Sequence, residues 1–452
     1  MKTIKTKNPY TQKTIKEYQL ITDDALNDKL KQGEAQFQHW KSVSIKKRTK
    51  LLTRVAELLI ERKESYAKLM AEEMGKPITQ GIAEIEKCAW VCDFYAKNAG
   101  DFLADQLIET DASESFISYD PLGMILAVMP WNYPFWQVMR FAAPTLTAGN
   151  VAVLKHASSV AGCAVELQKL FEDAGYPKGC FQTLLVDHNQ IEDIISNPII
   201  KAVTLTGSEV AGRKIAEIAG KNLKKTVLEL GGNNACIVLN DANLDEHIET
   251  ITWARMQNNG QSCIAAKRFL VQSEIYDEFL ERFKSEIENY NVGNPTSEDA
   301  KITCMASESL AEEVEEQVKK SMAKGATLFY GNERQTAYYQ PTIITDVKKG
   351  MPLFDEEVFG PVAAIIKVET KDEAYQLSSD SKLGLGAMIF TEDVEDAKHR
   401  ISEIEDGAFF INEMVKSDPR LPFGGTKASG YGRELSKEGI MEFVNKKTVY
   451  LK

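Results

Sequence analysis

A cysteine, a glutamate and an asparagine in this sequence could together carry out covalent chemistry on a carbonyl group. Cys263 ends a polar segment that follows a predicted helix at Ile248–Met256 and precedes a predicted strand at Arg268–Val271. A cysteine on such a connection can act as a nucleophile if a base and an oxyanion donor lie beside its thiolate. Taken alone, an unpaired cysteine is more often a small buried hydrophobic residue, so its partners decide the interpretation.

Glu229 is the candidate base. It ends the predicted apolar strand Thr226–Leu228, just before a pair of glycines. Desolvation there raises the pKa of a carboxyl group and suits it to accept a proton near neutral pH. The alternative role for Glu229 is a cap or an ion-pair partner.

Asn132 is the candidate oxyanion donor. It lies in Pro130–Pro134, and Pro134 suits the first position of a helix, so we expect a helix to begin there. The Asn132 amide could then point into a cleft and donate to a developing oxyanion. The alternative is that Asn132 caps this helix.

Two further segments suit a nucleotide. Leu205–Gly212 runs from a predicted strand through Gly207 into a predicted helix, whose free N-terminal amides could meet a pyrophosphate. Its glycine spacing is not the usual Gly-x-Gly-x-x-Gly pattern, and an ordinary turn is the alternative. Glu357 precedes the predicted strand Val362–Ile366, where a carboxylate could bind ribose hydroxyls.

The elements that position these residues follow from periodicity. Apolar residues three and four apart predict helices at Thr22–Trp40, Ile45–Met74 and Ile78–Leu103. Ser115–Tyr119 and Gly123–Val128 flank a turn signature and predict a hairpin. Strands then alternate with helices in two blocks, from residue 150 and again from 235 to about 412. This alternation predicts an α/β fold with parallel sheets.

Composition limits the class of protein. The chain has 452 residues, 43% of them hydrophobic and 27% charged, which predicts a soluble protein of two or three domains. Its net charge of -12 argues against nucleic acid or an anionic membrane as partner. No signal segment or membrane span is evident, so we expect a cytoplasmic protein. Seven scattered cysteines argue against a disulfide framework, and Cys88 and Cys92 predict a buried helix face without a metal.

The chain resembles the aldehyde dehydrogenase superfamily over nearly its whole length, on an ordered set of motifs around Asn132, Gly207, Glu229, Cys263, Glu357 and Leu421–Glu434. It looks most like the succinate-semialdehyde dehydrogenases, in the branch that reads Lys-His-Ala-Ser at 155–158. The resemblance implies that Cys263 attacks an aldehyde while the Asn132 amide and the Cys263 N–H hold the oxyanion. After hydride transfer to a nicotinamide, Glu229 would activate the water that hydrolyses the thioester.

The resemblance also implies NADP or NAD as cofactor, bound by Trp131, Lys155, Ser158, Gly207, Ser208, Gly212, Glu357 and Phe359. Many NAD-selective relatives have glutamate where this chain has Ser158. Serine removes the repulsion of a 2′-phosphate, so we expect NADP to be accepted. The alternative is that Ser158 only caps a helix beginning near Val160.

The substrate residues implied are Arg140, Gln257 and Phe423. Arg140 matches an arginine that binds the substrate carboxylate, whereas Gln257 stands where relatives often have arginine. Arg255 and Arg420 are further candidates, each expected to be a solvated surface arginine. The alternatives to a succinate-semialdehyde dehydrogenase are a broad aliphatic or aromatic aldehyde dehydrogenase and a catalytically silent relative with a binding role.

The resemblance implies an NAD(P)-binding domain of residues 1–108 and 129–234, a catalytic domain of residues 235–430, and an oligomerisation arm of residues 109–128 and 431–452. A predicted exposed strand near the C-terminus favours association, so we expect a homodimer or homotetramer. Ile302–Met305 departs from the family pattern, and the sequence assigns it no function.

Overall fold

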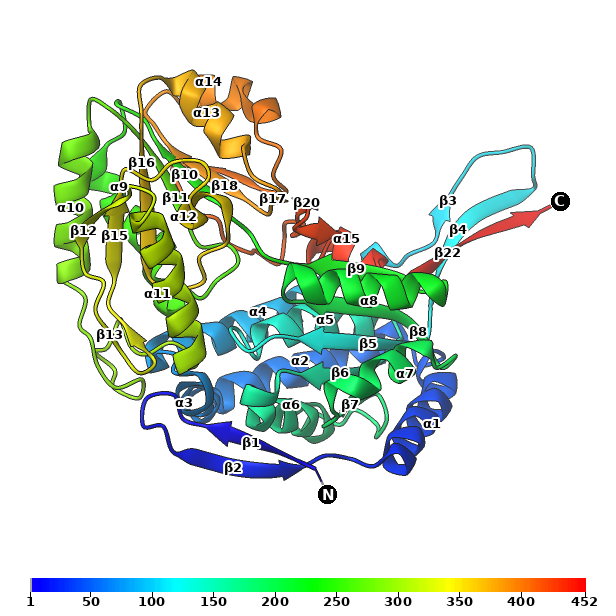
Figure 1. Cartoon of the computed structure of the whole chain (residues 1–452). Coiled ribbons are helices and arrows are strands. Elements are labelled where there is room, and N and C mark those ends of the chain that lie inside the picture. The colour runs from blue at the N-terminus through cyan, green and yellow to red at the C-terminus, as the bar shows by residue number, and fades with distance from the viewer. Residues whose placement is uncertain (1) are drawn as a thin grey trace.

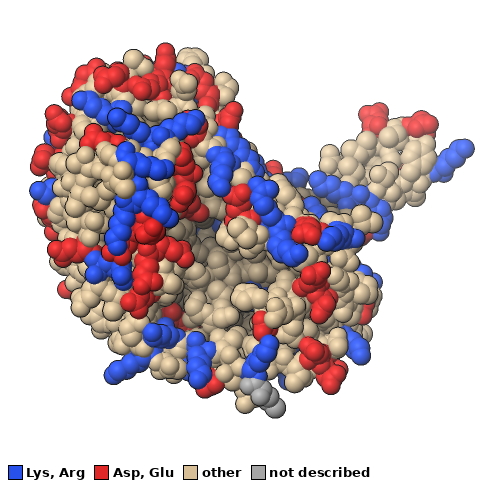
Figure 2. Space-filling model, in the orientation of Figure 1, with Lys and Arg blue, Asp and Glu red and all other residues tan. Residues whose placement is uncertain are grey.

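The computed structural model describes residues 2–452 and has two lobes, with an arm that projects from one of them (Figure 1). One lobe is built on a six-stranded sheet and the other on a seven-stranded sheet, whereas the arm is a three-stranded sheet. A hollow separates the two lobes in Figure 2. The α/β fold with parallel sheets is confirmed.

The six-stranded sheet brings three candidate residues to one edge. Its strands β9, β8, β5, β6 and β7 are parallel, and β21 joins β9 antiparallel. The carboxyl ends of neighbouring parallel strands share an edge, so the residues that follow β5, β8 and β9 meet there. The strands are β5 Met124–Met129, β6 Val151–His156, β7 Phe181–Thr183, β8 Ile200–Thr206, β9 Lys225–Glu229 and β21 Gly430–Tyr431.

The N-terminal region has four long helices where three were predicted. Arg62, with φ -115° and ψ 11°, interrupts the second predicted helix. Gly75 ends the third helix in the left-handed conformation that glycine accommodates, with φ 74°. The helices of this lobe are α1 Asp23–Trp40, α2 Ile45–Glu61, α3 Lys63–Met74, α4 Ile78–Phe102, α5 Trp136–Thr147, α6 Ala161–Asp173, α7 Ile191–Ser196 and α8 Glu209–Lys221. Cys88 and Cys92 are buried on α4, as predicted.

The seven-stranded sheet carries the connection that ends at Cys263. Its order is β12-β15-β16-β11-β10-β18-β19, parallel except for β12. The strands are β10 Ala235–Val238, β11 Arg268–Gln272, β12 Thr327–Tyr330, β15 Thr342–Thr345, β16 Val362–Val368, β18 Ala387–Phe390 and β19 Phe409–Ile411. Its helices are α9 Leu244–Met256, α10 Tyr276–Glu288, α11 Glu308–Met322, α12 Pro352–Asp355, α13 Lys371–Ser379 and α14 Val394–His399.

The hairpin predicted around Asp120 is wrong. β4 (Glu114–Pro121) pairs with β22 (Val444–Leu451) and with β3 (Gln106–Leu107), whereas β5 enters the six-stranded sheet. Nearly every residue of β5 is buried, which suits a strand covered on both faces. Gly123, with φ 140°, lets the chain pass between the two sheets.

β22 lies at the edge of the three-stranded sheet that forms the arm, and most residues of β22 are exposed. The short helix α15 (Ser436–Met441) precedes it and packs against α4 and α5. The predicted domain limits and the predicted oligomer stay predictions. No helix within residues 2–452 is long and apolar enough to cross a membrane.

Candidate active site

The turn that carries Asn132 is fixed by a buried carboxylate on α4. α5 begins at Trp136, so the prediction that Pro134 is its first residue is wrong by two positions. The amides of Phe135 and Trp136 each donate to Glu84 at 2.9 Å. Glu84 is also ion-paired with the buried Lys76. Glu84 therefore caps α5, and the alternative in which Asn132 does so is not observed.

Asn132 instead bridges two loops. Its Nδ2 donates to the Gln261 carbonyl at 3.1 Å, and its Oδ1 accepts from Gln137 at 3.0 Å. The side-chain Nδ2 of Asn258 donates to the backbone carbonyl of Asn132 at 2.9 Å. Asn132 is therefore held against the segment that leads to Cys263.

That segment has an unusual backbone. Asn258 and Asn259 have φ of 53° and 54°, in the left-handed region that asparagine tolerates better than most residues. The Asn259 side chain donates to the Thr303 hydroxyl and the Cys304 carbonyl at 3.0 Å, and it accepts from the Thr303 amide at 2.7 Å. The segment Ile302–Met305 thus supports the loop of Cys263, a role that the sequence did not reveal.

Cys263 is partly exposed, unlike the other cysteines. Burial raises the pKa of its thiol to about 11, although the charges of Arg140 and Lys267 act to lower it. The thiol form therefore predominates near neutral pH until a base or a bound ligand changes its surroundings.

Glu229 is 2% exposed at the end of β9. Burial, followed by the charge of Glu434, raises its pKa well above the ordinary value, while Arg140 acts to lower it. Within residues 2–452, neither carboxylate oxygen of Glu229 has a hydrogen-bond partner. The predicted rise in pKa is confirmed, and the alternative cap or ion pair is not observed.

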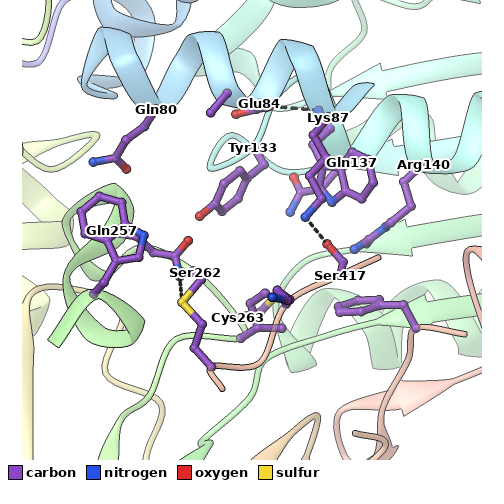
Figure 3. Close-up of a pocket in the computed structure, with 17 residues that line it drawn as sticks. Gln80, Glu84, Lys87, Tyr133, Gln137, Arg140, Gln257, Ser262, Cys263 and Ser417 are labelled. Carbon is purple, nitrogen blue, oxygen red and sulfur yellow. Dashed lines mark hydrogen bonds between the residues drawn. The ribbon is translucent and has the colours of Figure 1, made fainter. Parts of the chain in front are cut away.

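Two cavities meet at Cys263. The first has a volume of about 210 Å³ and is lined by several polar side chains together with aromatic rings (Figure 3). The second has a volume of about 240 Å³. Cys263 lines both of them, so groups bound in the two cavities would approach the same residue.

The second cavity has features that fit a dinucleotide. Gly207 and Ser208 line it at the N-terminus of α8, where free amides favour phosphate. Glu357 also lines it, and its Oε1 accepts from the Gly232 amide at 3.1 Å. Trp131 and Phe359 add two rings 5.8 Å apart. The cavity thus joins a helix N-terminus suited to phosphate to a carboxylate suited to ribose hydroxyls.

Three predicted cofactor residues lie outside this lining. Gly212 packs so closely that a Cβ would lie 2.6 Å from Leu230 Cδ1. Lys155, on β6, is 5% exposed, and burial lowers its pKa. Ser158 begins the short turn η1 (Ser158–Val160), whose N-cap is Ala157 without a side-chain capping bond. The helix that follows, α6, has Val160 at its N-cap and no side-chain capping bond, so the alternative in which Ser158 caps this helix is not observed.

The predicted substrate residues line the first cavity. Arg140 is ion-paired with Glu434, donates to the Thr206 hydroxyl at 3.3 Å, and lies 4.6 Å from the Phe423 ring centre. The Gln257 amide contacts Met414 Sδ at 3.8 Å. Arg140, Gln257 and Phe423 are thus brought together, with Arg140 already engaged by a carboxylate.

The two further arginine candidates differ in how far they are buried. Arg255 is 0% exposed and donates to the carbonyls of Ala266 and Gly260 at 2.8 and 2.7 Å, so its predicted place on the surface is wrong. Arg420 is a surface residue as predicted, with its side chain 68% exposed and 2.6 Å from Asp418.

Reasoning from the sequence did not identify several residues that shape the site. They are Lys76, Glu84, Lys87, Lys267, Thr303 and Ser417. Lys87 on α4 donates to the Ser417 hydroxyl at 2.9 Å, although the two are 330 positions apart. Local signals came from the position of Lys267, four residues after Cys263, and from the segment Ile302–Met305, which contains Thr303 and departs from the family pattern.

Known proteins resemble this chain along its whole length. Residues 1–449 match the family described as "Aldehyde dehydrogenase family". A probable succinate-semialdehyde dehydrogenase [NADP(+)] of Synechocystis sp. is 47% identical over 451 residues, 99% of each chain. A succinate-semialdehyde dehydrogenase [NADP(+)] of Mycobacterium tuberculosis is 44% identical over 454 residues, again 99% of each chain. The structure of a Streptococcus pyogenes succinic semialdehyde dehydrogenase in complex with NADP⁺ has a TM-score of 0.97 at 38% identity and covers 99% of both chains.

Proposed function

The chain belongs to the aldehyde dehydrogenase family, and we propose that it oxidises succinate semialdehyde to succinate, with NADP⁺ or NAD⁺ accepting the hydride. The observation that carries this proposal is that Cys263 lines both cavities. An aldehyde in the first cavity and a nicotinamide in the second would meet at its sulfur. The names of the relatives support the choice of substrate and of NADP⁺.

Cys263 attacks the aldehyde carbon in this proposal and forms a thiohemiacetal. The Asn132 amide carries two N–H donors, of which one is bonded to the Gln261 carbonyl. The second N–H remains for the oxyanion, together with the backbone N–H of Cys263. Loss of hydride from the thiohemiacetal leaves a thioester on Cys263.

Glu229 then activates a water molecule that hydrolyses the thioester and frees the thiol. Its carboxylate suits this step because burial raises its pKa, and because neither oxygen has a donor within residues 2–452. A carboxylate held in this way accepts a proton more readily than an exposed one.

The proposal extends to the surrounding residues. Arg140, Gln257 and Phe423 contact the substrate. The cofactor is bound by Trp131, Lys155, Ser158, Gly207, Ser208, Gly212, Glu357 and Phe359. The cofactor and catalytic domains follow the limits given above, and the arm, whose β22 is an edge strand, joins subunits into a dimer or tetramer.

An aldehyde panel tests this function. Wild type and Cys263→Ala are assayed for nicotinamide reduction with succinate semialdehyde, butanal and benzaldehyde, each with NADP⁺ and NAD⁺. We expect the highest kcat/KM for succinate semialdehyde and no turnover by Cys263→Ala. Equal efficiency on all three aldehydes would indicate a broad aldehyde dehydrogenase, and an inactive wild type would indicate a binding protein.

A further inference from the structure

The cations around the first cavity differ in how their charge is balanced. Arg140 is ion-paired with Glu434, and Lys416 lies 2.5 Å from Glu413. Lys87 also lines the cavity, yet within residues 2–452 no carboxylate forms a salt bridge with it. Among the three cations that line the first cavity, Lys87 is therefore the one that has no carboxylate partner within residues 2–452.

Neutral groups hold the Lys87 ammonium in place. Its Nζ donates to the Ser417 hydroxyl at 2.9 Å and lies 4.6 Å from the Trp136 ring centre. Figure 3 shows Lys87 extending from α4 to Ser417 on the side of the cavity where Arg140 also points inward. An ammonium has three N–H donors, so a single hydroxyl partner leaves donors for a ligand.

We propose that Lys87, positioned by Ser417, binds the distal carboxylate of the substrate and selects aldehydes that carry an anionic group. The proposal rests on the proposed oxidation of succinate semialdehyde and adds a residue that reads the end of the substrate remote from Cys263. A partly buried, unpaired ammonium gains strongly from an anion, because little water competes for it.

Arg140 is less able to make this selection alone. The Glu434 carboxylate offsets its charge, and its own charge lowers the pKa of Glu229. A change at Arg140 therefore alters the candidate base as well as the cavity. Lys87 has no hydrogen bond or salt bridge to Cys263, Glu229 or Asn132 among the described residues, so its replacement isolates the recognition of the carboxylate.

The experiment compares kcat/KM for succinate semialdehyde with kcat/KM for butanal, an uncharged aldehyde of the same chain length. The variants are Lys87→Met, Lys87→Gln and Lys87→Arg. The matched control is Arg420→Met, which removes a nearby exposed cation that is paired with Asp418 and lies outside the first cavity.

We expect Lys87→Met and Lys87→Gln to lower the ratio of the two efficiencies by about 10- to 100-fold, mainly through KM for succinate semialdehyde, as for the loss of a charged hydrogen bond. Lys87→Arg should retain most of the ratio, and Arg420→Met should leave it unchanged. An unchanged ratio in Lys87→Met or Lys87→Gln, or equal losses on both aldehydes, would overturn the proposal. Wild type that does not oxidise succinate semialdehyde would instead remove the proposed function itself.

Discussion

Lys267 Nζ donates a hydrogen bond of 2.8 Å to the backbone carbonyl of Cys263. The same buried ammonium donates to the Ser262 carbonyl at 3.0 Å and lies 3.2 Å from Glu357 Oε1. One lysine thus joins the loop of the candidate nucleophile to a carboxylate of the second cavity. Its charge lowers the pKa of the Cys263 thiol, but burial has the larger and opposite effect.

The pKa of about 11 for Cys263 predicts how the free enzyme reacts with iodoacetamide. Only the thiolate reacts, so the rate of alkylation at Cys263 should rise about tenfold per pH unit between about pH 6 and 9. The rate is measured by mass spectrometry of the peptide that contains Cys263, with Cys263→Ser as the control. A plateau near pH 7 would show that the thiolate already forms there.

Glu84 should matter for stability far more than its neighbour Glu86. Glu84→Ala leaves Lys76 buried without its ion-pair partner and removes the acceptor of two amides, which should cost about 3–5 kcal/mol. Glu86→Ala breaks an exposed ion pair with Lys63, which should cost at most about 1 kcal/mol. Thermal melts monitored by circular dichroism compare the two variants, and similar midpoints would contradict the role of Glu84.

Ser158 should influence the choice between NADP⁺ and NAD⁺. In the proposed cofactor site, Ser158→Glu would bring a carboxylate to the adenosine ribose, where it would repel a 2′-phosphate and accept bonds from ribose hydroxyls, so selectivity should shift toward NAD⁺. Ser159→Glu, one residue further along η1, is the control and should shift selectivity less. The measurement is kcat/KM for both cofactors. A constant ratio in Ser158→Glu would mean that the 2′-position is read elsewhere.

Because of Lys87, KM for succinate semialdehyde should depend on pH in a way that KM for butanal does not. Burial, followed by the charge of Arg140, lowers the pKa of Lys87 to about 8, so the ammonium is charged below this pH and neutral above it. KM for succinate semialdehyde should therefore rise as the pH passes about 8, while KM for butanal should not. The other charged or titratable groups around Lys87 include Glu84, Glu86, Cys88, Lys416, Asp418 and Arg420.

Lys87→Arg is the control for this profile. Its guanidinium stays charged throughout the range, so the rise of KM above about pH 8 should disappear. Parallel profiles for the two aldehydes in wild type would contradict the assignment.

Local sequence patterns predicted helices and strands well where the residues of the element itself determine its conformation. The long helix α4 and the buried strands β5, β6 and β8 follow from periodicity and apolar runs. Strand pairing was predicted wrongly at β4, because its partner β22 lies more than 300 residues away along the chain. A turn signature gives no information about such a partner.

In the candidate site, too, contacts between residues distant in the sequence could not be predicted from local patterns. Cys263, Glu229 and Asn132 stand out by their neighbours in sequence, whereas Glu84 and Lys87 look like ordinary polar residues of an amphipathic helix. Their importance comes from contacts with Phe135, Trp136 and Ser417, which only the folded chain brings near. The burial of Arg255 likewise depends in part on the carbonyls of Val358 and Gly360, which a loop distant in the sequence supplies.

In the proposed reaction Cys263 carries the acyl group and Glu229 removes it, and the variant Glu229→Gln separates these two roles. This variant is mixed with succinate semialdehyde and NADP⁺, and reduced cofactor is followed in a stopped-flow experiment. We expect a burst of about one reduced cofactor per subunit and then a stall, because hydride loss precedes hydrolysis. Peptide mass mapping of the stalled protein should find a succinyl group on Cys263. A slow reaction without a burst, or an acyl group on any other residue, would contradict the account.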